Sequence, residues 1–127
     1  GQAGPGIKFR PEDKQNFTLL LKAVRERLDA SSDSRGRRGA SRYTLSIATA
    51  GGAYFAQTEM DKLHPYVDWM NLMTYDFFTG STSTTGHHTP LLRSPYSTYT
   101  VSSTDSMVTQ HLAAGIPRQK LVIGAAF

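Results

Sequence analysis

Cysteine is absent from this sequence of 127 residues. The chain therefore has no disulfide bonds and no thiolate ligands for a metal, and its cysteine content leaves the redox compartment undecided. Long apolar runs are also missing, because no stretch approaches the ~18 residues of a membrane-spanning helix. The first six residues lack the basic and then apolar segments of a secretory signal peptide and are typical of a surface loop. We expect no membrane partner.

Positive charge is modest, with a formal net charge of +4, but it is unevenly placed. Arg35, Arg37, Arg38 and Arg42 crowd one segment rich in glycine and serine. A nucleic-acid-binding loop is one interpretation of this cluster, and a solvated connection between a helix and a strand is the other. No basic helix, stacking-aromatic pattern or zinc-ligand spacing accompanies the arginines. We therefore favour the solvated connection and expect no nucleic-acid partner.

Helical signals recur along the chain, whose length suits at most one domain with a modest core. The first helix begins near Pro11, a residue that suits a first helical turn, and its apolar side chains recur at helical spacing from Phe17 to Leu28. A loop at 31–41 ends this first helix. A second helix is expected from Thr58, as its cap, to His64, with Pro65 forcing its end. A third is expected from Ser103 or Thr104 through Ala114, where Gly115 stops it.

Strands are expected at 43–50, 67–76 and 121–127, one after each helix. Strands that are apolar on both faces and are separated by helices indicate a parallel sheet with right-handed crossovers. A closed (β/α)8 barrel takes roughly 250 residues, so three strands in this length make about half of one. The sequence predicts an α/β fold: a partial TIM barrel with three parallel strands alternating with helices. We expect residues 1–127 to be an incomplete domain whose two ends are cut.

The segment 67–77 is the most informative part of the chain. An apolar run carries Asn71 and then, at its far end, Tyr75 and Asp76. It is typical of a strand that is buried on both faces and that delivers polar groups to one rim of the sheet. In α/β barrels the carboxyl-terminal rim is where sites are assembled. We therefore place the candidate site there.

The same segment also carries a family resemblance. The Met73-Thr74-Tyr75-Asp76 element, with the residues around it, strongly resembles bacterial chitinases of glycoside hydrolase family 18. The match covers nearly the whole chain in order, through segments 45–50, 69–77, 86–89, 112–117 and 124–127. The resemblance implies that 67–76 is the sixth strand of the barrel and that the substrate is chitin or chito-oligosaccharides. It also implies secretion, because an insoluble polymer must be met outside the cell.

The chemistry implied by the resemblance is substrate-assisted retention, without a cofactor or a metal. The acetamido oxygen of the substrate attacks the anomeric carbon, while a glutamic acid protonates the leaving oxygen. In the family this glutamate closes an Asp-x-x-Asp-x-Asp-x-Glu motif on the fourth strand, and the motif is missing from these 127 residues. The chain resembles a central slice, from after the fourth strand through the seventh. We expect it to be inactive alone, and a chitin-binding lectin of the same fold, which lacks the acid, stays an alternative.

Three residues are the candidate site. Tyr75 can donate a hydrogen bond to the acetamido oxygen and stabilise the charge of the oxazolinium ion, although a tyrosine of the barrel core is the alternative. Asp76 can accept hydrogen bonds from a sugar hydroxyl and add negative potential, whereas a helix cap or a salt bridge to the next loop is the alternative. Strand alternation would point it away from Tyr75 unless the backbone bends. Met73 would shape the floor under the acetamido group, or be a plain core thioether.

Other polar and aromatic residues have structural interpretations that we favour. We interpret Asn71 as a buried amide that holds neighbouring strands together. His87 and His88 are adjacent, with no third metal ligand at a useful spacing, so we assign them to loop structure. Two aromatic pairs complete the set: Tyr66 and Trp69, assigned to the core, and Tyr54 and Phe55, for which sugar stacking is the less favoured alternative.

Overall fold

The computed structural model describes residues 6–127. The surface loop expected for the first six residues therefore lies outside the described part, except for Gly6. Helices and strands alternate in the order α1 (Asp13–Ser34), β1 (Ser46–Thr49), α2 (Ala53–Ala56), α3 (Met60–Leu63), β2 (Trp69–Leu72), α4 (Thr104–Ala113) and β3 (Leu121–Ile123). Short 3-10 turns lie at Gly39–Ser41, His64–Tyr66 and Arg118–Lys120.

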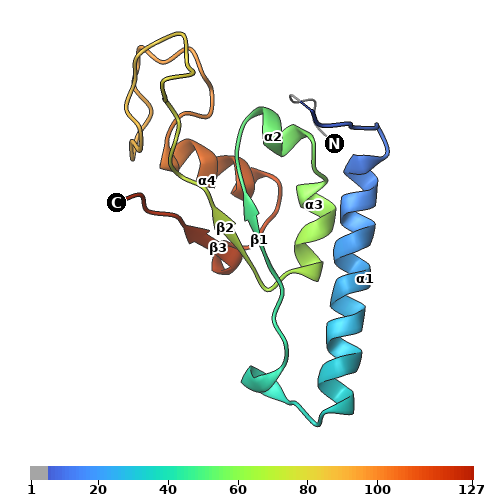
Figure 1. Cartoon of the computed structure of the whole chain (residues 1–127). Coiled ribbons are helices and arrows are strands. Elements are labelled where there is room, and N and C mark those ends of the chain that lie inside the picture. Colours follow the sequence, from blue (N-terminus) through green and yellow to red (C-terminus); the bar gives the residue numbers. More distant parts are fainter. Residues whose placement is uncertain (1–5) are drawn as a thin grey trace.

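The three strands form one parallel sheet in the order β1-β2-β3. Met70 of β2 pairs with Ile47 on one side and with Leu121 on the other. This confirms the predicted α/β class with three parallel strands alternating with helices. Figure 1 shows the sheet in the middle of the molecule, with the long helix α1 along one side.

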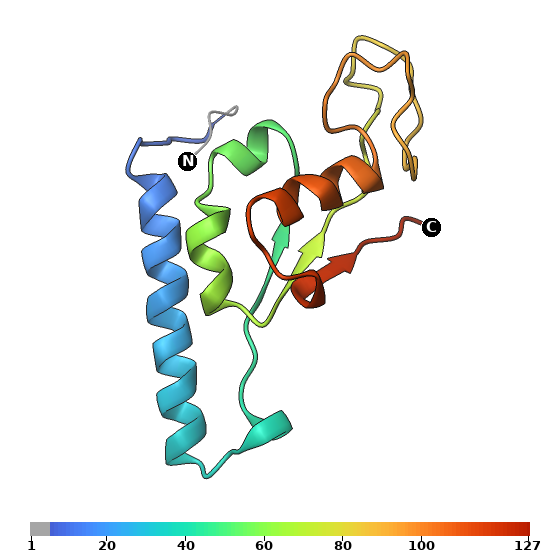
Figure 2. The same ribbon diagram turned by 180° about the vertical axis from the view of Figure 1, so that it is seen from behind.

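One face of the sheet carries the core. Met70 and Leu72 of β2 are fully buried against Met60 and Leu63 of α3 and Met107 of α4. Figure 2 shows α4 in front of the sheet and α3 between the sheet and α1. Each helix therefore returns the chain over the same face, as right-handed crossovers require.

Within residues 6–127 the other face of β2 is only half-buried, whereas the sequence predicted that 67–76 is buried on both faces. Asn71 is half-buried and Met73 is 36% exposed, whereas Met70 and Leu72 next to them are almost inaccessible. The core residues of α3 and α4 lie on the Met70 side, and within residues 6–127 no second layer covers the Asn71 side. The strand is apolar, as predicted, but within residues 6–127 only its Met70 side is fully buried.

The boundaries of several elements differ from the predictions. Helix α1 continues to Ser34, because Ser32 is buried, donates its hydroxyl hydrogen to the carbonyl of Leu28 and accepts the backbone N–H of Tyr43. The loop predicted at 31–41 therefore begins only after Ser34. Helix α2 was not predicted, and its four residues directly follow Gly51 and Gly52.

The second predicted helix is shorter at its start and runs further at its end. Thr58 does not cap α3, since its hydroxyl donates to the carbonyl of Phe55 instead. Pro65 does not stop the helical path, because it lies in the first positions of the following 3-10 turn, where a missing N–H costs nothing. The predicted strands shorten to the four, four and three residues that form ladders.

The chain between β2 and α4 is a long loop without helix or strand, and it projects beyond the sheet in both ribbon views. Ser103 caps α4 by accepting a hydrogen bond from the backbone N–H of Ser106, as the sequence predicted. Gly115 follows the helix with φ +83°, a conformation that favours glycine. Among the described residues, no helix is both long and apolar enough to cross a bilayer.

Candidate functional site

The candidate site lies where β1 and β2 end. Because the strands are parallel, their carboxyl ends meet at one rim, and Met73, Tyr75 and Asp76 follow the last ladder residue of β2. The backbone N–H of Met73 still donates to the carbonyl of Thr49, 2.9 Å away, so the path of β2 stays beside β1 to this point. The structure thus brings the three predicted residues to the rim that the sequence indicated. Their chemical roles stay predictions.

The backbone bends at Asp76. Its φ is +58°, which makes it the single non-glycine residue in 6–127 with a left-handed backbone. Asparagine and aspartate tolerate this conformation better than most residues. Strand alternation is broken there, and Asp76 and Tyr75 both line one pocket of about 390 Å³. Met73, Phe77 and Met107 also line this pocket. The remaining lining residues come from the segment after β1 and from the loop before α4: Ala50, Gly51, Gly52, Ala53, Tyr54, Tyr99, Thr100 and Val101.

Tyr75 is held against the end of β3. The backbone N–H of Gly124 donates to the carbonyl of Leu72, and the Thr74 hydroxyl donates to the carbonyl of Gly124 at 2.6 Å. A Cβ atom on Gly124 would stand 2.9 Å from Cε1 of Tyr75 and 2.7 Å from the carbonyl oxygen of Leu72. The missing side chain therefore makes room for the tyrosine ring. Among the described residues, the Tyr75 hydroxyl makes no hydrogen bond and is free to meet a ligand.

Asp76 is paired with the loop that follows it. Nε2 of His88 lies 2.5 Å from Oδ1 of Asp76, and the backbone N–H of Phe77 donates to the carbonyl of His88 at 3.1 Å. Asp76 thus contacts the next loop, as its alternative interpretation expected, through a hydrogen bond to His88. This contact coexists with the pocket position, because both side chains remain more than half exposed. His87, its neighbour, has no part in this pair and lines a separate hollow of about 340 Å³ inside the loop.

Sequence reasoning missed two residues that shape the rim. Gln110 of α4 accepts the backbone N–H of Gly52 at 2.9 Å, and fully buried His111 lies 3.1 Å from the Thr49 hydroxyl. Burial lowers the pKa of His111, because the charged ring would lose its hydration. The two side chains tie α4 to the end of β1. Their positions late in a predicted helix gave no signal of this, since the contact joins residues about 60 positions apart.

The aromatic residues divide between core and pocket. Phe55 packs its ring edge-on against His111, with centroids 4.8 Å apart, so it belongs to the core. Tyr54 is 58% exposed and lines the site pocket, which leaves sugar stacking open for it alone. Asn71 donates to the carbonyl of Ile47 at 3.4 Å, which agrees with its predicted role between strands. Tyr66 packs against the core cluster, as predicted, whereas Trp69 is half-buried and lies outside that cluster.

Metal ligands do not gather in the described part of the chain: no group of three histidine, aspartate or glutamate side chains there could hold an ion. His88 has one carboxylate partner, and His87 does not join it. The rim thus offers a phenol, a carboxylate and an apolar floor, with backbone groups from the Gly51-Gly52 turn beside them. This set suits a ligand that presents hydroxyl and amide groups along with an apolar face.

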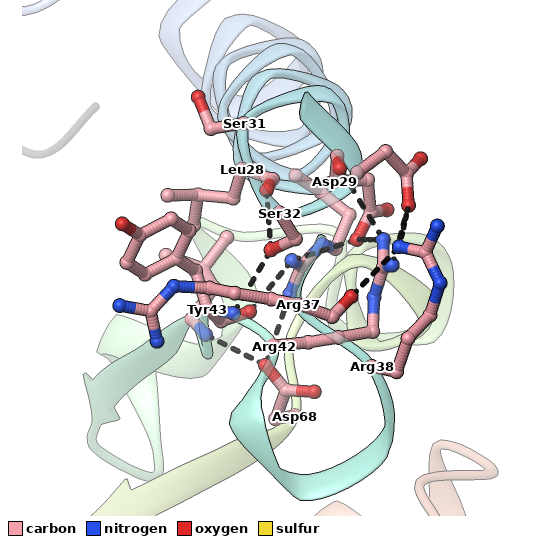
Figure 3. A network of polar contacts seen from close by, with 12 residues as sticks. Leu28, Asp29, Ser31, Ser32, Arg37, Arg38, Arg42, Tyr43 and Asp68 are labelled. Carbon is pink, nitrogen blue, oxygen red and sulfur yellow. Dashed lines mark hydrogen bonds and ion pairs between the residues drawn. The ribbon is translucent and has the colours of Figure 1, made fainter. Parts of the chain in front are cut away.

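The arginine cluster lies at the opposite ends of the strands. Figure 3 shows Arg37, Arg38 and Arg42 next to the last turns of α1. Arg42 bonds Asp33 at 2.7 Å and Asp29 at 3.1 Å, and Arg37 stacks over the ring of Tyr43 at 4.4 Å. The hydrogen bond from Arg42 lowers the pKa of Asp29.

A fourth arginine, Arg25 of α1, extends this network to the sheet. Arg25 bonds Asp68 at 3.0 Å, Asp29 at 2.9 Å and the carbonyl of Tyr43 at 2.9 Å. Asp68 also accepts the backbone N–H of Leu45, which fixes the start of β1 beside the start of β2. Most of these arginines therefore have intramolecular partners (Figure 3). The absence of a nucleic-acid partner stays a prediction.

Comparison with known proteins gives a consistent result. The profile of glycosyl hydrolases family 18 matches residues 3–127. Chitinase A1 of Niallia circulans is 41% identical over 96% of the chain and 18% of its own length. A solved structure of a glycoside hydrolase family 18 N-acetylglucosaminidase from Paenibacillus barengoltzii has a TM-score of 0.87 and 42% identity, over 96% of this chain and 35% of that one.

A third similar protein has been solved with a ligand. Catalytic domain 2 of the Group II chitinase of Ostrinia furnacalis, in complex with penta-N-acetylchitooctaose, has a TM-score of 0.74 and 28% identity, over 92% of this chain and 28% of that one. In each comparison this chain spans about a third or less of the similar protein.

Proposed function

The chain belongs to glycosyl hydrolases family 18, and on that premise we propose that it is the central part of a chitinase barrel that hydrolyses β-1,4-linked N-acetylglucosamine polymers. The fold supports this, because three parallel strands alternating with helices are superposable on family 18 enzymes. The single observation that carries the proposal is the pocket at the carboxyl rim that Met73, Tyr75 and Asp76 line together.

The proposed reaction is substrate-assisted and retains the anomeric configuration. The acetamido oxygen of the bound sugar attacks its own anomeric carbon, and a cyclic oxazolinium ion forms as the glycosidic oxygen leaves with a proton. That proton comes from a glutamic acid for which these 127 residues hold no motif. The chain contributes the environment of the reacting sugar.

Tyr75 and Asp76 have complementary roles in this scheme. The Tyr75 hydroxyl donates to the acetamido oxygen, which orients the oxygen for attack. As the ring closes, positive charge spreads over the oxazolinium, and the carboxylate of Asp76 at the pocket wall adds a favourable negative potential. Met73, part-exposed at the same pocket, provides an apolar floor for the acetamido methyl group.

The pocket and the comparisons support this substrate class. Aromatic Tyr54 and Tyr99 line the wall beside the phenol and the carboxylate, and sugar rings combine apolar faces with hydroxyl edges. A related chitinase domain has been solved with an N-acetylated chito-oligosaccharide. We extend that ligand class to this chain, and propose that the complete protein is secreted to reach its polymer.

The test is an assay of the complete protein that carries this segment, with chito-oligosaccharides as the substrate. We expect turnover, and a large loss of turnover in Tyr75→Phe and Asp76→Asn. Tyr66→Phe, a tyrosine packed against the core away from the rim, is the matched control and should stay active. Full turnover in both site variants would defeat the proposal.

A chitin-binding lectin of the same fold is the second candidate, since these 127 residues hold no acid motif. Such a protein would bind the sugar through the same pocket without cleaving it. Retention of the complete protein on chitin, with Tyr75→Phe weakening the binding and no product formed by the unsubstituted protein, would favour the lectin.

A further inference from the structure

His88, within the long loop between β2 and α4, contacts the candidate carboxylate of Asp76. Its Nε2 atom lies 2.5 Å from Oδ1 of Asp76, although twelve positions separate the two residues. A second link runs along the backbone, where the N–H of Phe77 donates to the carbonyl of His88. The two links hold one short stretch of the loop alongside the bend that follows β2.

Asp76 needs such a partner more than a strand residue would. Its left-handed backbone turns it into the pocket, and its side chain is 64% exposed. An exposed carboxylate without a partner samples several rotamers, so its charge would not stay at one place. A hydrogen bond from an imidazole N–H to one oxygen fixes the carboxylate plane and leaves the second oxygen, Oδ2, available.

The loop segment that carries His88 is held in place by backbone hydrogen bonds. Two residues further along, the carbonyl of Pro90 accepts the backbone N–H of Thr104, and the carbonyl of Leu91 accepts that of Asp105, each at 2.9 Å. These bonds join the segment to the first turn of α4. His88 therefore stands on a stretch anchored to β2 at one end and to α4 at the other.

We propose that His88 is a positioning residue of the sugar site, which orients the carboxylate of Asp76 toward the reacting sugar. This deepens the proposed function and rests on it. Nε2–H of His88 donates to Oδ1, while Oδ2 faces the ligand. His88 does not touch the substrate, and its contribution passes through Asp76.

Four substitutions in the complete protein test this role. His88→Gln places an amide N–H near the position of Nε2 and keeps the bond, whereas His88→Asn is too short to reach it. His88→Ala removes the donor. His87→Ala is the matched control, because His87 is the neighbouring exposed histidine and has no bond to Asp76.

Hydrolysis of chito-oligosaccharides and thermal melting are measured for each variant. We expect kcat to fall about 10- to 100-fold in His88→Ala and His88→Asn, the scale of losing a hydrogen bond to a charged group. KM should change much less, His88→Gln should keep most of kcat, and His87→Ala should match the unsubstituted protein. In an Asp76→Asn background, His88→Ala should add almost no further loss.

Several results would overturn the inference. Equal kcat in His88→Ala and His87→Ala, equal kcat in the Gln and Asn variants, or losses that multiply in the double variant would each show that His88 does not act through Asp76. If His88→Ala melts early, the comparison of the Gln and Asn variants decides. An inactive unsubstituted protein would instead defeat the proposed function, and the role of His88 with it.

Discussion

The hydroxyl of Thr49, at the end of β1, donates a hydrogen bond to Nε2 of His111 on α4, 3.1 Å away. The direction follows from the other ring nitrogen, since Nδ1 lies 2.8 Å from the carbonyl of Met107, which can only accept. Burial lowers the pKa of His111 and so favours the neutral ring, in which the proton lies on Nδ1 and Nε2 accepts. Because the carbonyl of Thr49 also accepts the N–H of Met73, this contact connects α4 to the candidate site.

Replacing His111 with leucine should destabilise the complete protein by about 2–4 kcal/mol, because the Thr49 hydroxyl and the Met107 carbonyl would each lose a partner in a buried place. Urea denaturation measures the change. Exposed His87→Leu is the control and should stay within ~0.5 kcal/mol of the unsubstituted protein. A similar stability for the two leucine variants would show that the buried bond is unimportant.

Stability should fall as the pH is lowered through the histidine range. Burial lowers the pKa of His111, and burial together with the charge of Lys120 lowers that of His64. The unfolded state then binds protons below the ordinary histidine pKa of 6.5 while the folded state does not, so the free energy of unfolding declines below that pH. The slope is at most about 1.4 kcal/mol per pH unit for each proton.

A second loss should follow in stronger acid. The pKa of Asp29 is lowered by Arg42, and that of Glu59 by Lys62 and the Thr18 hydroxyl, so their contributions persist above the ordinary carboxyl values of 3.8 and 4.5 and disappear below them. Melting temperatures between pH 8 and pH 3 check both windows. In His111→Leu the decline between pH 6.5 and 5 should be smaller, and an unchanged decline would contradict the assignment to His111.

The fold was predictable where local signals dominate. Apolar runs set the three strands, and the Ser103 hydroxyl and Gly115 set the ends of α4, because capping chemistry is local. The end of α1 was missed, since the bonds that extend it come from Tyr43, eleven residues after Ser32. Which face of β2 is covered also depends on helices elsewhere in the sequence, and periodicity does not report this.

The site was predictable from the motif only in part. Tyr75 and Asp76 were placed on the rim by the end of an apolar run, and the sequence left open whether the backbone bends between them. The bend is the φ of +58° at Asp76, and it accompanies a contact with His88 that lies twelve residues further along the chain. Gln110 and His111 were missed because their partners lie on the turn after β1, about 60 residues earlier.

Gly124→Ala should impair both turnover and stability. The new Cβ would stand 2.9 Å from Cε1 of Tyr75 and 2.7 Å from the backbone oxygen of Leu72, so both the ring and the backbone beside β2 must shift. Misplacing a group that orients the substrate by about 1 Å can cost on the order of 10²-fold, and we expect kcat to fall about 10- to 100-fold. Gly80→Ala is the control, because a Cβ there meets nothing within 4 Å. Equal kcat in the two variants would count against a role for Tyr75.

Arg25→Met should lower stability and leave catalysis alone. The Arg25 side chain is only 15% exposed and joins Asp68, Asp29 and the carbonyl of Tyr43 at the amino ends of the strands, remote from the carboxyl rim. We expect a loss of about 1–3 kcal/mol, the scale of hydrogen bonds to charged groups, with kcat within about twofold. Denaturation and initial rates measure the two effects. Exposed Arg27→Met, on the same helix, should change neither.

The 127-residue chain by itself should not hydrolyse chito-oligosaccharides, and it should self-associate. General acid catalysis typically contributes about 10²–10⁴-fold, and the chain holds no motif for the acid. Both β1 and β3 are edge strands of the sheet, and Val122 and Ile123 of β3 are 45% and 58% exposed, so backbone and apolar groups are open to pairing. Sedimentation over a concentration series and thermal melting test this. Ile123→Lys should reduce association, whereas Leu92→Lys, on the exposed loop, should not. A dilute monomer with a sharp melt, or measurable hydrolysis, would contradict the expectation.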